Sequence, residues 1–190
     1  DYGRVYIQEQ TAPGVWSAPT QLSSYVGTSG GIWTRPLVDL SAYAGKKVRI
    51  YFGLVNGGGA DVSAGWYLDD ITIDVVPANK TVPFAEDYQG GLGNWWATNG
   101  TWEVGGPPTA GPAECHNAST TCAATVLNGD YPNINSSLVS PSITLPAITT
   151  GEELHLRFWH WFSFALTSGC FGCDHDYGRV YIQEQTSPGG

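Results

Sequence analysis

The sequence predicts an all-β protein built as a two-sheet antiparallel β-sandwich, or jelly roll. Three observations support this prediction. The 190 residues are 42% hydrophobic but only 13% charged, and they include 25 glycines and 12 prolines. This balance is typical of a turn-rich β protein and not of a helical or disordered chain. Several segments alternate apolar and polar residues with a period of two, and no segment has the pattern of a long amphipathic helix.

The strongest strand predictions fall at residues 47–55, 65–76 and 153–164. In the first, Val48, Ile50, Phe52 and Leu54 share one face. Within 65–76, the same alternation places Tyr67, Asp69, Ile71 and Ile73 on one face. Within 153–164, one face carries Leu154, Leu156, Phe158, His160, Phe162 and Phe164, while Arg157, Trp159 and Trp161 lie on the other. His155 and His160 therefore lie on opposite faces and cannot form a joint site.

The segment 32–40 is interrupted by Pro36, which indicates an edge strand or a bulge.

One stretch of sequence occurs twice. Residues 1–11, DYGRVYIQEQT, recur letter for letter as residues 176–186. The recurrence predicts a tandem repeat with a period of 175 residues, and a period of that length indicates an array of whole domains. The duplicated stretch has the composition of a β-strand, with Val5 and Ile7 on one face of the first copy and Val180 and Ile182 on one face of the second.

This duplication predicts the domain organisation. Residues 1–77 are expected to be the second half of one module, 78–83 a linker, and 84–190 the first half of the next. The two halves together would form one permuted sandwich, with 176–190, the duplicate of 1–15, as a linking strand. Two arrangements stay open: strand exchange between units, by strand addition, or plain beads on a string.

Charge and composition restrict the partners and the cellular location. The net charge of −9 argues against nucleic acid and anionic membranes as partners. No apolar run has the length of a bilayer span, so membrane insertion is not expected. The sequence has no signal peptide and no Met, so we expect an internal piece of a longer product, secreted or displayed at the cell surface.

The four cysteines are predicted to form disulfides, as their even number in an extracellular chain suggests. Of the three possible pairings we favour Cys115–Cys122 with Cys170–Cys173, since each pair closes a short loop rich in small residues. A zinc site is the alternative, because His116 and His175 lie near these cysteines.

Four Asn-x-Ser/Thr sequons predict N-glycosylation on one stretch of the chain. Their acceptors are Asn79, Asn99, Asn117 and Asn135. The alternative is that some of these sequons occur by chance in a sequence rich in Ser and Thr.

Several segments together resemble the bacterial extracellular MAM-like domains, which are jelly rolls related in shape to concanavalin A-like modules. The matching segments are residues 38–45, 48–52, 65–71, 138–145, 156–161 and 176–182. The resemblance implies the permuted order described above, with a strand at 84–88 beginning a module. It also implies a structural calcium ion between that strand and the strand containing Trp66 and Tyr67. The matching carboxylates are Asp69, Asp70, Glu86 and Asp87, and calcium prefers such hard oxygen ligands. The alternative is that these are solvated charges at strand ends.

Two classes of function are compatible with the sequence, and neither is enzymatic, because no nucleophile or carboxylate pair has a recognisable catalytic setting. The first is a structural repeat unit of an extracellular filament or stalk, whose copies join head to tail. The second is a carbohydrate-binding or adhesin module. In that module, tryptophans stack on a glycan; the candidates are Trp95, Trp96 and Trp102, with Trp159 and Trp161. The same tryptophans would otherwise belong to the core or to contacts between repeats.

Overall fold

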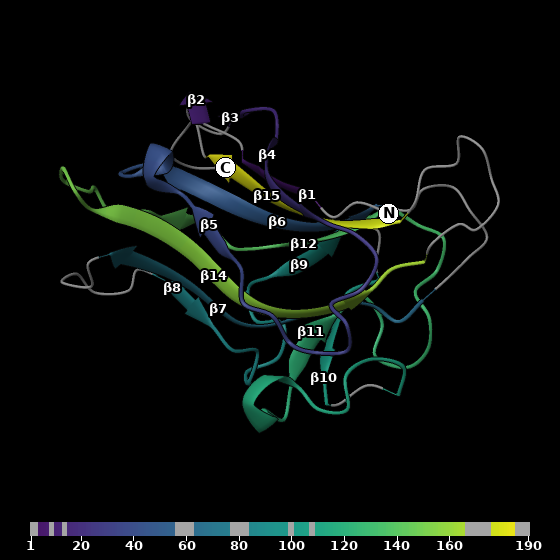
Figure 1. Cartoon of the computed structure of the whole chain (residues 1–190). Coiled ribbons are helices and arrows are strands. Elements are labelled where there is room, and N and C mark those ends of the chain that lie inside the picture. The colour runs from purple at the N-terminus through teal and green to yellow at the C-terminus, as the bar shows by residue number, and fades with distance from the viewer. Residues whose placement is uncertain are drawn as a thin grey trace.

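Two β-sheets pack face to face in the computed structural model of the chain (Figure 1). The structure describes residues 4–7, 10–12, 15–55, 63–76, 84–98, 101–106, 109–165 and 176–184. Sequence order and spatial order differ strongly, because each sheet combines strands from the beginning and the end of the chain. The predicted two-sheet β-sandwich is therefore confirmed.

The first sheet has seven strands in the order β4–β1–β15–β6–β12–β9, with β13 pairing with β6. Their bounds are β4 (Thr20–Tyr25), β1 (Arg4–Ile7), β15 (Tyr177–Glu184), β6 (Lys47–Val55), β12 (Ser136–Val139), β9 (Trp96–Thr98) and β13 (Ile143–Thr144). A small hairpin, β2 (Gln10–Ala12) with β3 (Val15–Trp16), lies between β1 and β4 in the sequence.

The second sheet has six strands in the order β10–β11–β7–β14–β5, with β8 pairing with β7. Their bounds are β10 (Glu103–Gly105), β11 (Cys122–Ala124), β7 (Gly65–Val76), β14 (Glu153–Ser163), β5 (Leu37–Asp39) and β8 (Phe84–Glu86). The edge position of β5, directly after Pro36, agrees with the edge strand expected there. Two 3-10 turns, η1 (Ser41–Tyr43) and η2 (His116–Ala118), are the only helical elements among the described residues.

The core lies between the sheets and is dominated by the central strands β6, β7 and β14. The inward residues of β6 and β14 are those that the alternation predicted. Trp66 on β7 is fully buried, and its ring contacts those of Phe52, Phe164 and Tyr25 at centroid distances of 5.8, 6.1 and 5.8 Å. Burial of such aromatic side chains provides the main stabilisation of a sandwich of this size.

The alternation predicted along β7 is broken at Asp70. This residue has a φ of 45°, and the pairing with β14 shifts register between Arg157 and Trp159. The bulge sends Tyr67 and Asp69 to the outer side of the sheet, whereas Ile71 and Ile73 point into the core. The prediction that these four residues share one face was therefore wrong, because a bulge inserts an extra residue and inverts the alternation beyond it.

The two copies of the duplicated stretch lie side by side in the seven-stranded sheet (Figure 1). β1 pairs with β15 in parallel and in register, so that Val5 lies beside Val180 and Ile7 beside Ile182. β1 also pairs antiparallel with β4, and β15 pairs antiparallel with β6 over eight residues. All other pairs among the described strands are antiparallel.

A buried histidine is part of the core. The Nε1–H of Trp66 donates to Nδ1 of His160 at 3.1 Å, which requires a neutral acceptor nitrogen. Burial lowers the pKa of His160 to about 3. Because this pKa is lower in the folded than in the unfolded chain, the unfolded state binds more protons between about pH 3 and 6.5, and stability falls as the pH falls through that window.

We predict that His160→Asn will reduce the acid sensitivity of the fold, since its carboxamide oxygen takes the place of Nδ1, can still accept from Trp66 and does not titrate. From about pH 6.5 to 4 the wild type should lose about 3 kcal/mol more of its unfolding free energy than the variant. Urea unfolding of both proteins over this pH range measures the difference. Parallel pH profiles would contradict the assignment of His160 as a buried neutral acceptor.

Candidate functional site

The bulge in β7 places two neighbouring carboxylates at the outer side of the six-stranded sheet. Asp69 is completely buried, its Oδ1 accepts from the backbone N–H of Asp70 at 2.9 Å, and its Oδ2 has no hydrogen-bond partner. Burial, with smaller contributions from the charges of Asp70 and Asp87, raises the pKa of Asp69 to about 7. An unpaired buried carboxylate is costly, so this position needs a proton or a cation.

Glu86 and Asp87 approach from β8 and the turn that follows it, and they play different roles. Both carboxylate oxygens of Glu86 are occupied, one by the backbone N–H of Tyr88 at 2.9 Å and the other by Nε1 of Trp95 at 3.0 Å. Asp87 uses Oδ1 to accept from the backbone N–H of Gln89 at 3.0 Å. Glu86 is thus held by donors from Tyr88 and Trp95, which belong to the core, whereas the charge of Asp87 acts on Asp69 and raises its pKa.

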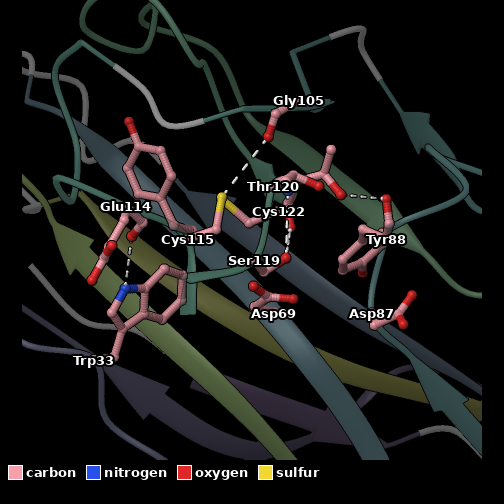
Figure 2. The surroundings of a disulfide bond; sticks show 12 residues. Trp33, Asp69, Asp87, Tyr88, Gly105, Glu114, Cys115, Ser119, Thr120 and Cys122 are labelled. Atoms are coloured by element: carbon pink, nitrogen blue, oxygen red, sulfur yellow. Dashed lines mark hydrogen bonds between the residues drawn. A yellow bond between two sulfur atoms is a disulfide. The ribbon is translucent and has the colours of Figure 1, made fainter. Parts of the chain in front are cut away.

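The loop closed by the Cys115–Cys122 disulfide forms the third side of the site (Figure 2). Nδ1 of His116 lies 2.8 Å from Oδ2 of Asp70, and the imidazole stacks on Trp159 with centroids 4.0 Å apart. On the other side, Gln89 Nε2 donates to Oγ of Ser119 at 2.6 Å. The loop is therefore held against β7, β8 and β14 together.

Two pockets open at this junction. One of about 220 Å³ is lined by Asp70, Asp87, Gln89, His116, Asn117 and Ser119. A neighbouring one of about 460 Å³ is lined by Arg35, Asp70, Ile71, Thr72, Ala85, Glu86, Asp87 and Trp159. The Arg35 guanidinium lies 5.9 Å from the Trp159 ring centroid. Carboxylates, one guanidinium and one indole thus line a continuous polar surface, which provides ligands for a cation or for hydroxyl groups.

The carboxylates fit a hard cation only in part. Asp69, with its unpartnered buried oxygen, and Asp70 and Asp87, which line the smaller pocket, could hold calcium. Glu86 is already satisfied by other donors. Among the described residues, no three His, Cys, Asp or Glu side chains converge on one point in the present geometry. Calcium at Asp69, Asp70, Glu86 and Asp87 therefore stays a prediction.

The cysteines and sequons are described in part. The Cys115–Cys122 disulfide is present as predicted, whereas Cys170 and Cys173 lie outside the described residues. Asn117 and Asn135 are described, while Asn79 and Asn99 lie outside the described residues. Asn117 is exposed on the disulfide loop, as glycosylation requires.

No helix in the described part of the chain is long and apolar enough to cross a membrane.

The tryptophans proposed to stack on a glycan do not form one platform. Trp95 and Trp102 are buried in the core, so neither offers a face to solvent. Trp96 is 39% exposed and points to the outer side of the other sheet. The half-buried Trp159, beside the larger pocket, is the indole available at this site. The stacking of His116 on Trp159 joins residues 43 positions apart, and no local pattern could have revealed it.

Comparison with known proteins gives a limited result. No family model matches the chain, and no solved structure matches it. Over 82 residues, 43% of its length, the chain is 33% identical to bacillopeptidase F of Bacillus subtilis (strain 168). The match spans about 5% of that much longer protein.

We predict that calcium will stabilise the chain through the acidic site. Saturating Ca²⁺ should raise the unfolding midpoint by about 5–10 °C relative to EDTA, because a ligand at about one hundred times its Kd contributes about 2.7 kcal/mol. Asp69→Asn should abolish this response. In EDTA at about pH 8, the same variant should be more stable than the wild type, since it removes an uncompensated buried charge.

Differential scanning calorimetry with Ca²⁺, Mg²⁺ and EDTA measures both effects. Glu153→Gln, an exposed carboxylate on β14 outside the site, is the matched control and should respond to Ca²⁺ as the wild type does. An identical midpoint with Ca²⁺ and EDTA would show that calcium has no role here.

Proposed function

We propose that the chain is a structural repeat unit of an extracellular filament or stalk, and that units join head to tail through the duplicated strand. The pairing of β1 with β15 is the observation that supports this proposal. Two identical strands occupy neighbouring places in one sheet, each residue beside the residue 175 positions away. One chain therefore contains two strands that suit the same place between β4 and β6.

The direction of the strands supports the equivalence of the two copies. β4 is antiparallel to β1, β6 is antiparallel to β15, and β1 is parallel to β15. If either copy were absent and the sheet closed, the remaining copy would be antiparallel to both neighbours. Both copies also have a glycine at the position where the strand crosses Trp66. A side chain at Gly178 would overlap the ring of Trp66, and the first copy has Gly3 at the equivalent position.

Holding both copies in one sheet has a cost. Identical strands paired in register put each residue type beside itself, so Arg4 and Arg179 share one register position. Parallel pairing is also slightly less stable per residue than antiparallel pairing. A sheet with this arrangement favours replacement of one copy by a strand from a neighbouring unit, which is how runaway strand exchange builds linear polymers.

Other features are compatible with a secreted structural role. The Cys115–Cys122 disulfide is of the kind that persists in oxidising compartments. We assign no catalytic activity to the chain. The matched segment is a small part of bacillopeptidase F, which fits a module that accompanies other domains better than it fits a peptidase.

We predict that strand exchange can be trapped with cysteines at a register pair between β6 and β15. Tyr51 lies opposite Tyr181 in this pair, and opposite residues on antiparallel strands are close enough for a disulfide. A mixture of Tyr51→Cys and Tyr181→Cys chains, incubated at high concentration and then oxidised, should yield a disulfide-linked dimer on non-reducing gels. The double variant Tyr51→Cys/Tyr181→Cys provides the control for geometry.

The two outcomes are distinct. Exchange gives interchain crosslinks in the mixture and a ladder of crosslinked oligomers for the double variant. If the double variant forms only an intrachain crosslink and the mixture none, β15 stays in its own sheet and the units are not joined by exchange.

Glycan binding is a second candidate, favoured by the larger pocket. Its volume of about 460 Å³ is suited to one or two sugar rings. Trp159 contributes an indole, one face of which is stacked on His116, Arg35 provides hydrogen-bond donors, and the carboxylates of Asp70 and Asp87 accept from hydroxyl groups. These are the groups with which proteins recognise neutral sugars.

We predict that, if this candidate is right, Trp159→Ala will weaken binding to a neutral polysaccharide at least about tenfold, in keeping with the loss of one buried aromatic contact. Affinity electrophoresis against a panel of soluble glucans, mannans and xylans measures the retardation. Trp96→Ala, on the other sheet, should behave as the wild type. Wild-type mobility unchanged by every polysaccharide in the panel would count against glycan binding at this pocket.

A further inference from the structure

The two sheets differ strongly in the charge of their strands. Strands of the seven-stranded sheet contain the cationic residues Arg4, Lys47, Arg49 and Arg179 and a single carboxylate, Glu184. Strands of the six-stranded sheet contain Asp39, Asp69, Asp70, Asp74, Glu86, Glu103 and Glu153 and a single cationic residue, Arg157. The described strands of the two sheets therefore carry mainly opposite charges, although the net charge of the chain is −9.

The cationic face is the outer side of the seven-stranded sheet around Lys47, Arg49 and Arg179. The guanidinium of Arg49 lies 3.8 Å from the ring centroid of Trp16 and 5.3 Å from that of Trp96. Beside it, Tyr51 and Tyr181 are in edge-to-face contact at 5.8 Å, and Nη1 of Arg179 donates to the hydroxyl of Tyr181 at 3.3 Å. Tryptophan, tyrosine and arginine are the residue types that most often dominate binding energy at protein interfaces.

Apolar side chains are exposed beside this face. Val15, next to Trp16, is 57% exposed and Trp96 is 39% exposed, so apolar surface remains open beside the stacked guanidinium. The aromatic rings hold Arg49 in place, which lowers the entropy lost when a carboxylate binds it.

The acidic face is the outer side of the six-stranded sheet at Asp39, Asp74 and Glu153. These residues come from β5, β7 and β14, and the register brings Asp39 and Asp74 to either side of His155. The Glu153 side chain is 64% exposed and the Asp74 side chain 27% exposed. His155 and Arg157 lie between these carboxylates, with Nε2 of His155 2.7 Å from Oε2 of Glu153 and Nε of Arg157 3.9 Å from Oδ2 of Asp74.

We propose that the cationic face of one unit docks on the acidic face of a second copy of the chain. Charge complementarity selects this occupant, because the chain itself supplies both the carboxylates and the guanidinium groups that pair with them. The two faces lie on opposite layers of the sandwich, so the contact is heterologous and can repeat along a stack. This inference rests on the proposed role as a repeat unit and assigns the surface through which neighbouring units touch.

Charge reversal on the full chain tests the docking. Lys47→Glu/Arg179→Glu reverses the cationic face, and Asp39→Lys/Glu153→Lys reverses the acidic face. Each should weaken reversible self-association, measured by sedimentation velocity, at least about tenfold. An equimolar mixture of the two variants should associate again in equal proportions, because the unchanged acidic face of the first variant fits the unchanged cationic face of the second and their reversed faces are also complementary. Raising NaCl from about 50 to about 500 mM should dissociate the wild-type assembly.

The control Glu114→Lys/Asp130→Lys changes two exposed carboxylates outside both faces and should associate as the wild type does. Unfolding midpoints close to that of the wild type confirm that each variant is folded. A wild type that stays monomeric at low salt, or reversed variants that associate normally and form no mixed pair, would overturn the docking proposal.

The same measurements separate docking from strand exchange. Oligomers joined by exchanged strands persist at high salt and give interchain crosslinks between Tyr51→Cys and Tyr181→Cys chains regardless of face charge. Docked units dissociate in salt and need no crosslink between β6 and β15. Either proposal can therefore fail while the other stands.

Discussion

The pairing of β7 with β14 is the constraint on which the rest of the structure depends. These two strands share ten register pairs at the centre of the six-stranded sheet, and both direct large apolar side chains into the core. The bond between Trp66 and His160 connects them within that core, where a lost acceptor would leave an indole N–H unpaired. The seven-stranded sheet packs against the inner side of this pair, and the candidate site is built on the outer side of the pair.

The bulge at Asp70 links the core to that outer site. A regular strand would have sent Asp69 and Ile71 to the same side, and either a carboxylate would have entered the core or an isoleucine would have left it. The extra residue resolves this conflict and turns two adjacent carboxylates toward the disulfide loop. Positive φ at a non-glycine residue is uncommon, and such strain often accompanies binding sites.

Period-two alternation was sufficient to predict the sandwich, the inward residues of β6 and β14, and the edge position of β5. It could not reveal the bulge, because Asp69 and Asp70 differ in environment but not in residue type. The tryptophans were harder still: burial of Trp95 and Trp102 depends on which strands meet across the core, and the packing of Trp159 against His116 depends on a loop folded back by a disulfide. Local sequence contains none of these contacts between distant segments.

The duplicated strand has a physical meaning that sequence identity alone does not give. Identity shows that two segments can take the same place, whereas the sheet shows both segments side by side, as a parallel pair with two arginines at one register position. Both neighbours of this pair come from the first half of the chain: β4 lies on one side, and β6, which is followed in the sheet by β12 of the second half, lies on the other. A strand supplied by another copy would meet the same hydrogen-bonding partners, the same Trp66 and the same register. Strand exchange would therefore change which chain a strand belongs to and leave the packing of the sheet unchanged, which is the condition for a repeat unit to extend without limit.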